Sequence, residues 1–119
     1  MLYRTAISDA RSELGDTYVG SYSYAPADVI RYAAEGVRAA WIKRPSLRYD
    51  EATGLLYDPA VVLPKVETDD YLPVPLAEAA QPALAFFIVF RCLSRDVTDK
   101  GNAAAAAAAK AQFDQIVMG

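Results

Sequence analysis

The chain has 119 residues, with 12 Lys or Arg against 15 Asp or Glu, so its formal net charge is −3. It contains no His and a single Cys, which excludes an internal disulfide, His-based catalytic triads and His-based metal sites. The length predicts one domain over residues 1–119, and no membrane segment is expected, because the longest apolar run, residues 83–90, is far shorter than the roughly 20 residues that a span needs.

A first helix is predicted close to the N-terminus. Apolar residues recur there at spacings of four, three and four positions, as on one face of a helix: Tyr3, Ile7, Ala10 and Leu14. The pattern predicts a helix over residues 2–14 that Gly15 ends. The next stretch, residues 17–25, mixes Gly, Ser and Tyr without a helical period, so we expect an ordered loop that crosses the bundle.

A second helix is predicted from Pro26 to Arg44. Proline suits the first turn of a helix, and Pro45 marks the end of this one. The segment is amphipathic, with its charged residues away from the inward stripe, which includes Ile30, Val37 and Trp41.

The pattern changes between residues 46 and 75. Two short β-type runs, residues 55–57 and 61–63, are separated by turn-forming residues, and several prolines limit them to edge strands or extended chain. We therefore predict an extended β-like arm or hairpin over residues 47–75, between the second and third helices. A connection of this length is long for a compact bundle, which favours a functional surface.

Two further helices are predicted after the arm. The third, residues 76–96, is apolar on almost every side, so the bundle or a neighbouring subunit must cover it. After a connection at residues 98–102, seven consecutive alanines from Ala103 open the fourth helix. The expected fold is mainly α: a small four-helix bundle of residues 1–46 and 76–119 with the arm. We expect its core to contain Ile7, Leu14, Ile30, Val37, Trp41, Leu84, Ile88, Phe113 and Ile116.

Negative charge and tyrosine are concentrated on or before the arm. Residues 49–80 carry seven acidic groups and one basic group, and all eight tyrosines precede residue 72. Tyrosine is enriched in protein interfaces, although these side chains could equally pack the arm onto its own bundle. The candidate protein-interface residues are Tyr49, Leu55, Leu56, Tyr57, Val61, Val62, Leu63 and Tyr71 on the arm, with Phe86 and Phe90 on the third helix.

No catalytic, cofactor or metal site is predicted. The glycines of residues 15–21 have phosphate-loop spacing but lack the required Lys, and Cys92 lies in an apolar run typical of a buried thiol. The acids at 69–70 and at 96 and 99 are interpreted as turn or capping residues rather than cation ligands. The basic cluster Lys43, Arg44 and Arg48 is interpreted as helix capping, with phosphate contact as the alternative.

Several runs, in this order, resemble the head-to-tail adaptor (connector, or head-completion) proteins of tailed phages. They are Leu14-Gly15-Asp16, residues 28–36, Lys43-Arg44-Pro45, residues 70–75, residues 90–96, and Gly101-Asn102 before an alanine-rich helix that reaches Phe113. The match covers about three quarters of the chain, and residues 47–68 match least. These runs are packing patterns and carry no catalytic residue.

The resemblance implies a structural, non-enzymatic virion protein. Such a protein assembles in the host cytoplasm into a homo-oligomeric ring, typically twelve-fold, at the neck between the capsid portal and the tail. Its expected partners are itself, the portal protein and a tail or nozzle protein, with genomic DNA passing through without sequence-specific binding. The alternative is a small helical regulatory or protein-interaction module that binds one partner through residues 86–90. A metal-dependent hydrolase is the third and least supported hypothesis.

Overall fold

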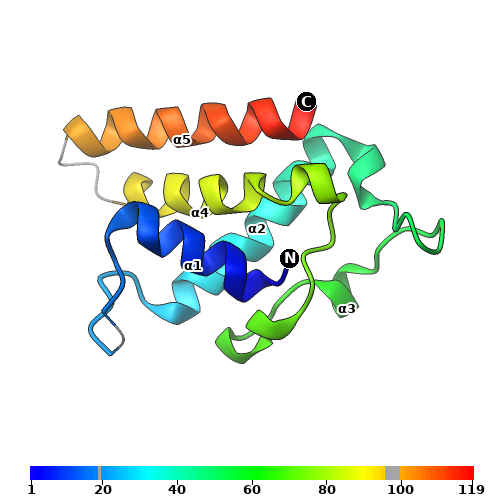
Figure 1. Ribbon diagram of the computed structural model, residues 1–119, viewed down its shortest axis with the longest axis horizontal. Coiled ribbons are helices and arrows are strands. Elements are labelled where there is room, and N and C mark those ends of the chain that lie inside the picture. Colours follow the sequence, from blue (N-terminus) through cyan, green and yellow to red (C-terminus); the bar gives the residue numbers. More distant parts are fainter. Residues whose placement is uncertain (19, 96–99) are drawn as a thin grey trace.

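The computed structural model describes residues 1–18, 20–95 and 100–119 and is mainly helical, as predicted (Figure 1). Its α-helices are α1 (Tyr3–Leu14), α2 (Pro26–Lys43), α3 (Pro59–Val62), α4 (Ala83–Ser94) and α5 (Lys100–Met118). Three short 3-10 helices lie between them: η1 (Pro45–Arg48), η2 (Glu67–Tyr71) and η3 (Glu78–Ala80). No helix in the described part of the chain is long and apolar enough to cross a membrane.

The centre of the fold is α4, which packs against α1, α2 and α5 (Figure 1). Its inward side chains are among the most buried of the protein: Ala83, Leu84, Phe87, Ile88, Val89 and Cys92. The remaining phenylalanines, Phe86 and Phe90, are half-buried. The third predicted helix was expected to be covered by the bundle or by a neighbouring subunit. The bundle itself covers most of the corresponding helix, α4.

The observed α4 begins later than the predicted third helix. Residues 76–82 contain only the short η3, and Pro82 stands directly before α4. A helix running through Pro82 would lose one backbone hydrogen bond and clash with the preceding turn, so the long helix is divided here. The predicted end at Asp96 lies outside the described residues.

Local end signals place α1 and α2 where the sequence predicts them. Gly15 follows α1 with a φ of 69°, a left-handed conformation that glycine adopts without a steric penalty. Pro26 occupies the first turn of α2, whose inward stripe includes Ile30, Val37 and Trp41, all of them buried as expected.

The inward face of α1 is rotated from the expected one. Ala6 and Ala10 are fully buried together with Tyr3, whereas Ile7 and Leu14 are only half-buried. The small alanine side chains let α1 lie close to its neighbours, which leaves the larger residues at the edge of the contact.

The contact between α2 and α4 requires Gly36. A Cβ at this position would lie 2.7 Å from Cδ1 of Leu84 and 2.8 Å from Cδ1 of Phe87. Both of these side chains are buried, so neither can move away freely. Glycine therefore allows the two helix backbones to approach at this point.

The last helix, α5, covers the remaining side of α4. It starts at Lys100, so the predicted connection at residues 98–102 is wrong for residues 100–102, while residues 98–99 lie outside the described residues. Its buried positions are Ala106, Ala109, Phe113 and Val117, and the expected core residue Ile116 is half-buried. The rings of Phe113 and Phe87 have centroids 5.1 Å apart.

A carboxylate joins the C-terminal ends of α2 and α5. Asp114 accepts from Lys110 at 2.7 Å and from Lys43 at 3.1 Å. Partial burial raises the pKa of the Asp114 carboxyl, but the hydrogen bonds and positive charges of the two lysines outweigh it and hold that pKa below its ordinary value.

The predicted β-like arm is not a pair of strands. Within the described ranges, the only β-type pairings are two isolated bridges, between Tyr49 and Leu56 and between Leu2 and Pro73. Residues 61–62, predicted as β-type, end the short helix α3 instead. The Asp58 carboxylate accepts the backbone N–H of Ala60 at 3.0 Å and caps this helix, a local contact that favours the helical turn.

The base of the arm is tied to the bundle. The backbone N–H of Tyr3 donates to the Leu72 carbonyl at 3.0 Å, and that of Val74 donates to the Met1 carbonyl at 2.9 Å. The Tyr3 hydroxyl also donates to the Val62 carbonyl at 3.1 Å. Residues 47–75 are therefore a folded extension of the bundle at their base.

A buried ion pair orders the loop between α1 and α2. Arg11 donates to the Asp16 carboxylate at 2.6 Å, and both side chains are more than nine-tenths buried. The same carboxylate accepts the backbone N–H groups of Ser23 and Tyr24, at 2.8 and 3.2 Å. Asp16 thus brings the two ends of the loop together at one end of the bundle, so the described part of the connection does not cross the bundle as expected (Figure 1).

Trp41 joins α2 to the arm, so its removal should be costly. The side chain is 7% exposed, and its Nε1–H donates to the Pro75 carbonyl at 3.2 Å. We expect Trp41→Ala to lower the free energy of unfolding by about 3–5 kcal/mol, measured by urea denaturation. The neighbouring Ile42→Ala is the control, because Ile42 is 82% exposed. A loss below about 1 kcal/mol for Trp41→Ala would contradict the packing described.

Adding a methyl group at Gly36 should destabilise the fold although alanine favours helices. We expect Gly36→Ala to lower the free energy of unfolding by about 1–3 kcal/mol, because the new Cβ overlaps Leu84 and Phe87. A double-mutant cycle with Leu84→Ala tests the cause, since removing the Leu84 side chain relieves the closest overlap. Additive losses in the cycle would show that the overlap is not the reason.

Candidate interaction surfaces

Most of the exposed large apolar side chains of the arm were predicted as interface residues. Exposed fractions reach 69% for Leu55 and 68% for Val61, with Tyr71 at 56%, Tyr49 at 53% and Leu56 at 52%. Val66, 55% exposed, was not predicted, because its charged neighbours Lys65 and Glu67 hide it in the pattern. Exposed apolar side chains at these positions are available to bind another protein.

The other three predicted arm residues face the bundle. Leu63 is only 5% exposed, and Val62 is half-buried, so both attach the arm to the core. Tyr57 stacks on Trp41 with ring centroids 6.3 Å apart and an interplanar angle of 10°. Leu63 and Tyr57 are therefore packing residues, and the alternative that some arm side chains pack internally is correct for them.

A tight turn carries the most exposed part of the arm, here called the hairpin tip (residues 50–56). The Asp50 N–H donates to the Leu55 carbonyl at 2.8 Å, and the Gly54 N–H donates to the Asp50 carbonyl at 2.7 Å. Gly54 has a φ of 71°, which explains the glycine in the turn. The tip therefore presents Leu55 and Leu56 beside the acidic Asp50 and Glu51.

The hairpin tip is anchored to α2 through Arg48. Its Nε–H donates to the Tyr57 carbonyl at 3.2 Å, and its guanidinium lies 5.5 Å from the centroid of the Trp41 ring. Burial raises the pKa of the Tyr57 hydroxyl, and the nearby negative charges of Asp50 and Glu51 raise it further. The anchor gives the tip a defined position relative to the bundle.

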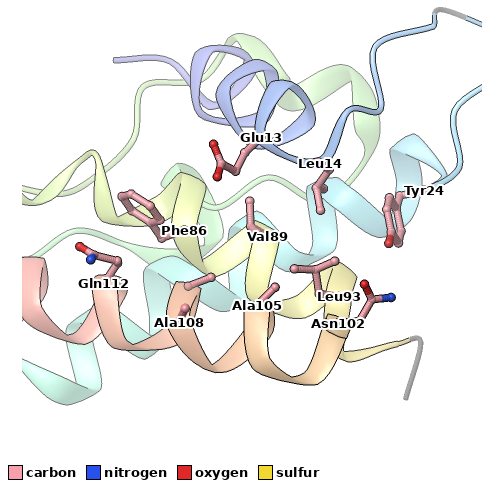
Figure 2. Close-up of a pocket in the computed structure, with 11 residues that line it drawn as sticks. Glu13, Leu14, Tyr24, Phe86, Val89, Leu93, Asn102, Ala105, Ala108 and Gln112 are labelled. Carbon is pink, nitrogen blue, oxygen red and sulfur yellow. The ribbon is translucent and has the colours of Figure 1, made fainter. Parts of the chain in front are cut away.

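A first groove, the α1–α5 groove, lies over α4 between α1 and α5 (Figure 2). It has a volume of about 540 Å³. Phe86 and Val89 of α4 point into it, and Ala105 and Ala108 of α5 face them from the other side (Figure 2). Phe90, the second predicted residue of α4, instead meets Phe87 edge-on, with ring centroids 5.7 Å apart.

The chemistry of the α1–α5 groove suits binding. Its ionisable lining side chains are one carboxylate, Glu13, and the phenol of Tyr24, with amides from Asn102 and Gln112. Apolar side chains make up the rest of the lining, so the groove offers contact area without paired acid and base groups.

A second groove, the α2–α3 groove, lies between α2 and the arm. It has a volume of about 420 Å³ and an apolar lining of Ala34, Pro59, Ala60, Leu63 and Pro64. Arg31, Arg38 and Lys65 also line it, together with the carboxylate Glu35, which accepts from Arg91 at 3.0 Å. Sequence reasoning missed this groove, because only the fold brings α3 beside α2.

The residues considered for other chemistry have structural roles. Burial raises the pKa of the Cys92 thiol to about 11, so little reactive thiolate forms at neutral pH. Asp69 accepts the backbone N–H groups of Lys65 and Val66, which lower its pKa. No cluster of three or more potential metal ligands occurs among the described residues, which leave out Asp96 and Asp99.

The basic cluster at the end of α2 is also used within the fold. Lys43 pairs with Asp114, Arg44 donates to the Val117 carbonyl at 3.3 Å, and Arg48 holds the hairpin. These three side chains are therefore used in contacts with α5 and with the hairpin, and none of the three contacts caps α2.

Comparisons with protein-family models, with curated protein sequences and with solved structures gave no match.

Loss of the Arg48 anchor should loosen the hairpin tip while leaving the bundle folded. We expect Arg48→Ala to speed hydrogen exchange at the Asp50 and Tyr57 amides and to lower the free energy of unfolding by about 1 kcal/mol. Arg44→Ala is the matched control, because that side chain contacts α5 and not the hairpin. Unchanged exchange at both amides would show that Arg48 does not hold the tip.

Proposed function

We propose that the chain is a structural head-to-tail adaptor of a tailed phage. In this proposal, copies of the four-helix bundle form a ring, of twelve subunits by analogy with the family, at the virion neck between the portal and the tail. The resemblance of the sequence to this family suggests the class. The observation that carries the proposal is the set of exposed large apolar side chains at or beside the hairpin tip, Tyr49, Leu55 and Leu56, because several such side chains on one short segment are typical of a protein interface.

The arrangement of the surfaces also supports assembly into a ring. A closed ring needs two different, complementary faces on every subunit. The chain carries a projecting hairpin tip and, separately, two grooves. Contacts with the portal and with a tail or nozzle protein would use the exposed surfaces that remain.

The charge distribution is compatible with a channel for genomic DNA. The arm is acidic, and the phosphate backbone of DNA is negatively charged, so arm carboxylates that face the channel would repel DNA and limit sticking. The proposed role is therefore passive, and it requires neither sequence-specific DNA binding nor catalysis.

The second candidate function is a module that binds one protein partner. It is favoured by the α1–α5 groove, where half-buried Phe86 and the alanines of α5 provide apolar contact area beside polar side chains such as Gln112 (Figure 2). A partner helix could dock there as helices dock into apolar grooves elsewhere.

The experiment that separates the two functions is native mass spectrometry of the full chain, alone and with a portal ring from the same phage. The adaptor proposal expects a closed ring that binds the portal, whether the ring forms free in solution or only on the portal. Leu55→Asp combined with Leu56→Asp should weaken that assembly by about tenfold or more, because it places charge in the contact. Ile42→Asp is the control, since Ile42 is more exposed than either leucine but lies on α2.

Two results would contradict the adaptor proposal. One is a chain that stays monomeric and does not bind the portal. The other is an assembly that tolerates the changed tip but is lost with Ala108→Glu, an exposed position in the α1–α5 groove. That second result would favour the single-partner module.

A further inference from the structure

We propose that the hairpin tip of one copy docks into the α2–α3 groove of a second copy. This inference deepens the proposed function and rests on it, because the contact would be the lateral joint of the ring. Its basis is the charge and apolar character of two surfaces that lie on different parts of the same chain.

The groove is positively charged around an apolar floor. Arg38 and Lys65 are exposed and have no ion-pair partner within the described ranges. Arg31, the third cation of the lining, forms an ion pair with Asp28, which also pairs with Arg95. The one lining carboxylate, Glu35, is already paired with Arg91. A ligand entering this groove would therefore meet Arg38, which has no charged partner there, and Lys65, whose positive charge is only partly offset by the nearby Asp69 carboxylate, so it would be favoured by negative charge.

The hairpin tip has the opposite character. Glu51 is exposed and has no ion-pair partner in the described part of the chain, and Asp50 stands beside it. Leu55 and Leu56 add two apolar side chains, 69% and 52% exposed. A groove of about 420 Å³ falls in the size range that accepts small ligands or several side chains, so it can receive them.

The tip is held away from the groove of its own copy. It is joined to α3 by only Tyr57 and Asp58, and Tyr57 is fixed by stacking on Trp41 and by the Arg48 anchor. In Figure 1 the hairpin projects from the right-hand end of the molecule, beyond α3. The occupant of the groove is therefore the tip of another copy.

The two surfaces differ, so the contact is heterologous. Each copy uses its tip on one neighbour and its groove on the other, and repetition of the contact gives a ring when the rotation closes. Nucleic acid is a weaker occupant, because a few cations on a chain of net charge −3 provide little phosphate binding.

Reversal of one charge on each surface tests the contact. Arg38→Glu and Glu51→Arg change exposed side chains without ion-pair partners among the described residues, so both variants should fold, which circular dichroism checks. We expect each single variant to weaken self-association by about tenfold or more, in sedimentation velocity and native mass spectrometry of the full chain, with and without the portal ring. The double variant should recover most of the loss, because the charges are again opposite.

Two matched reversals elsewhere serve as controls. Glu78→Arg changes an exposed acid on η3 that has no ion-pair partner among the described residues. Arg4→Glu changes an exposed base on α1 whose one ion pair, with Asp70 at 3.6 Å, lies on the surface. Neither position lines the α2–α3 groove or belongs to the hairpin tip. Both controls should associate as the unchanged chain does.

The inference is overturned if the single variants associate normally, if the double variant does not recover, or if the unchanged chain never self-associates, even on the portal. It is also overturned if Arg38→Glu loses binding to labelled duplex DNA while Glu51→Arg leaves self-association intact. If the charge reversals do not change self-association and the chain still binds the portal, the contact between the tip and the groove is refuted but the adaptor proposal is not. Self-association that depends on these charges but is not accompanied by portal binding would support the contact between the tip and the groove and would contradict the adaptor proposal.

Discussion

Burial of α4 is the constraint on which the rest of the structure depends. From Ala83 to Phe90 the helix has no charged side chain, so water must be excluded from nearly its whole circumference. Three helices do this, and each of them approaches through small residues: α1 through its alanines, α2 through Gly36, and α5 through Ala106 and Ala109. The close approach fixes the position of α2 relative to α4. It therefore also fixes the position of Trp41, near the end of α2, and of the arm that packs on Trp41.

The arm combines a rigid base with a solvated tip. Its base is hydrogen-bonded to the N-terminal residues and covers Trp41, whereas its tip places leucines and carboxylates in solvent. Because the tip is anchored, it has less conformational freedom before a partner binds. The loss of conformational entropy on binding is therefore smaller, and it offsets less of the contact energy. An interface built on such a tip can be small and still be specific.

The helices were predictable where the signal is local. Gly15 and Pro26 mark helix ends through their own backbone preferences, and α1 and α2 lie where those residues predict. The β-type interpretation of residues 61–62 was wrong, because their apolar side chains also suit a short capped helix and the Asp58 cap favours the helix. Exposure of Leu55 and Leu56 was predicted, but the α2–α3 groove could not be, since it exists only after Lys65 is brought beside Arg38.

The attachment of α5 is unevenly distributed along its length. Its first half meets the bundle through methyl groups, such as those of Ala106 and Ala109, while Phe113 and Val117 supply the larger buried area of the second half. Each buried methylene-sized group stabilises by only about 0.8 kcal/mol, so the alanine half has the lower opening free energy. Local unfolding therefore begins at the N-terminal end of α5 and uncovers Phe86 and Val89 while Phe113 still holds the helix in place.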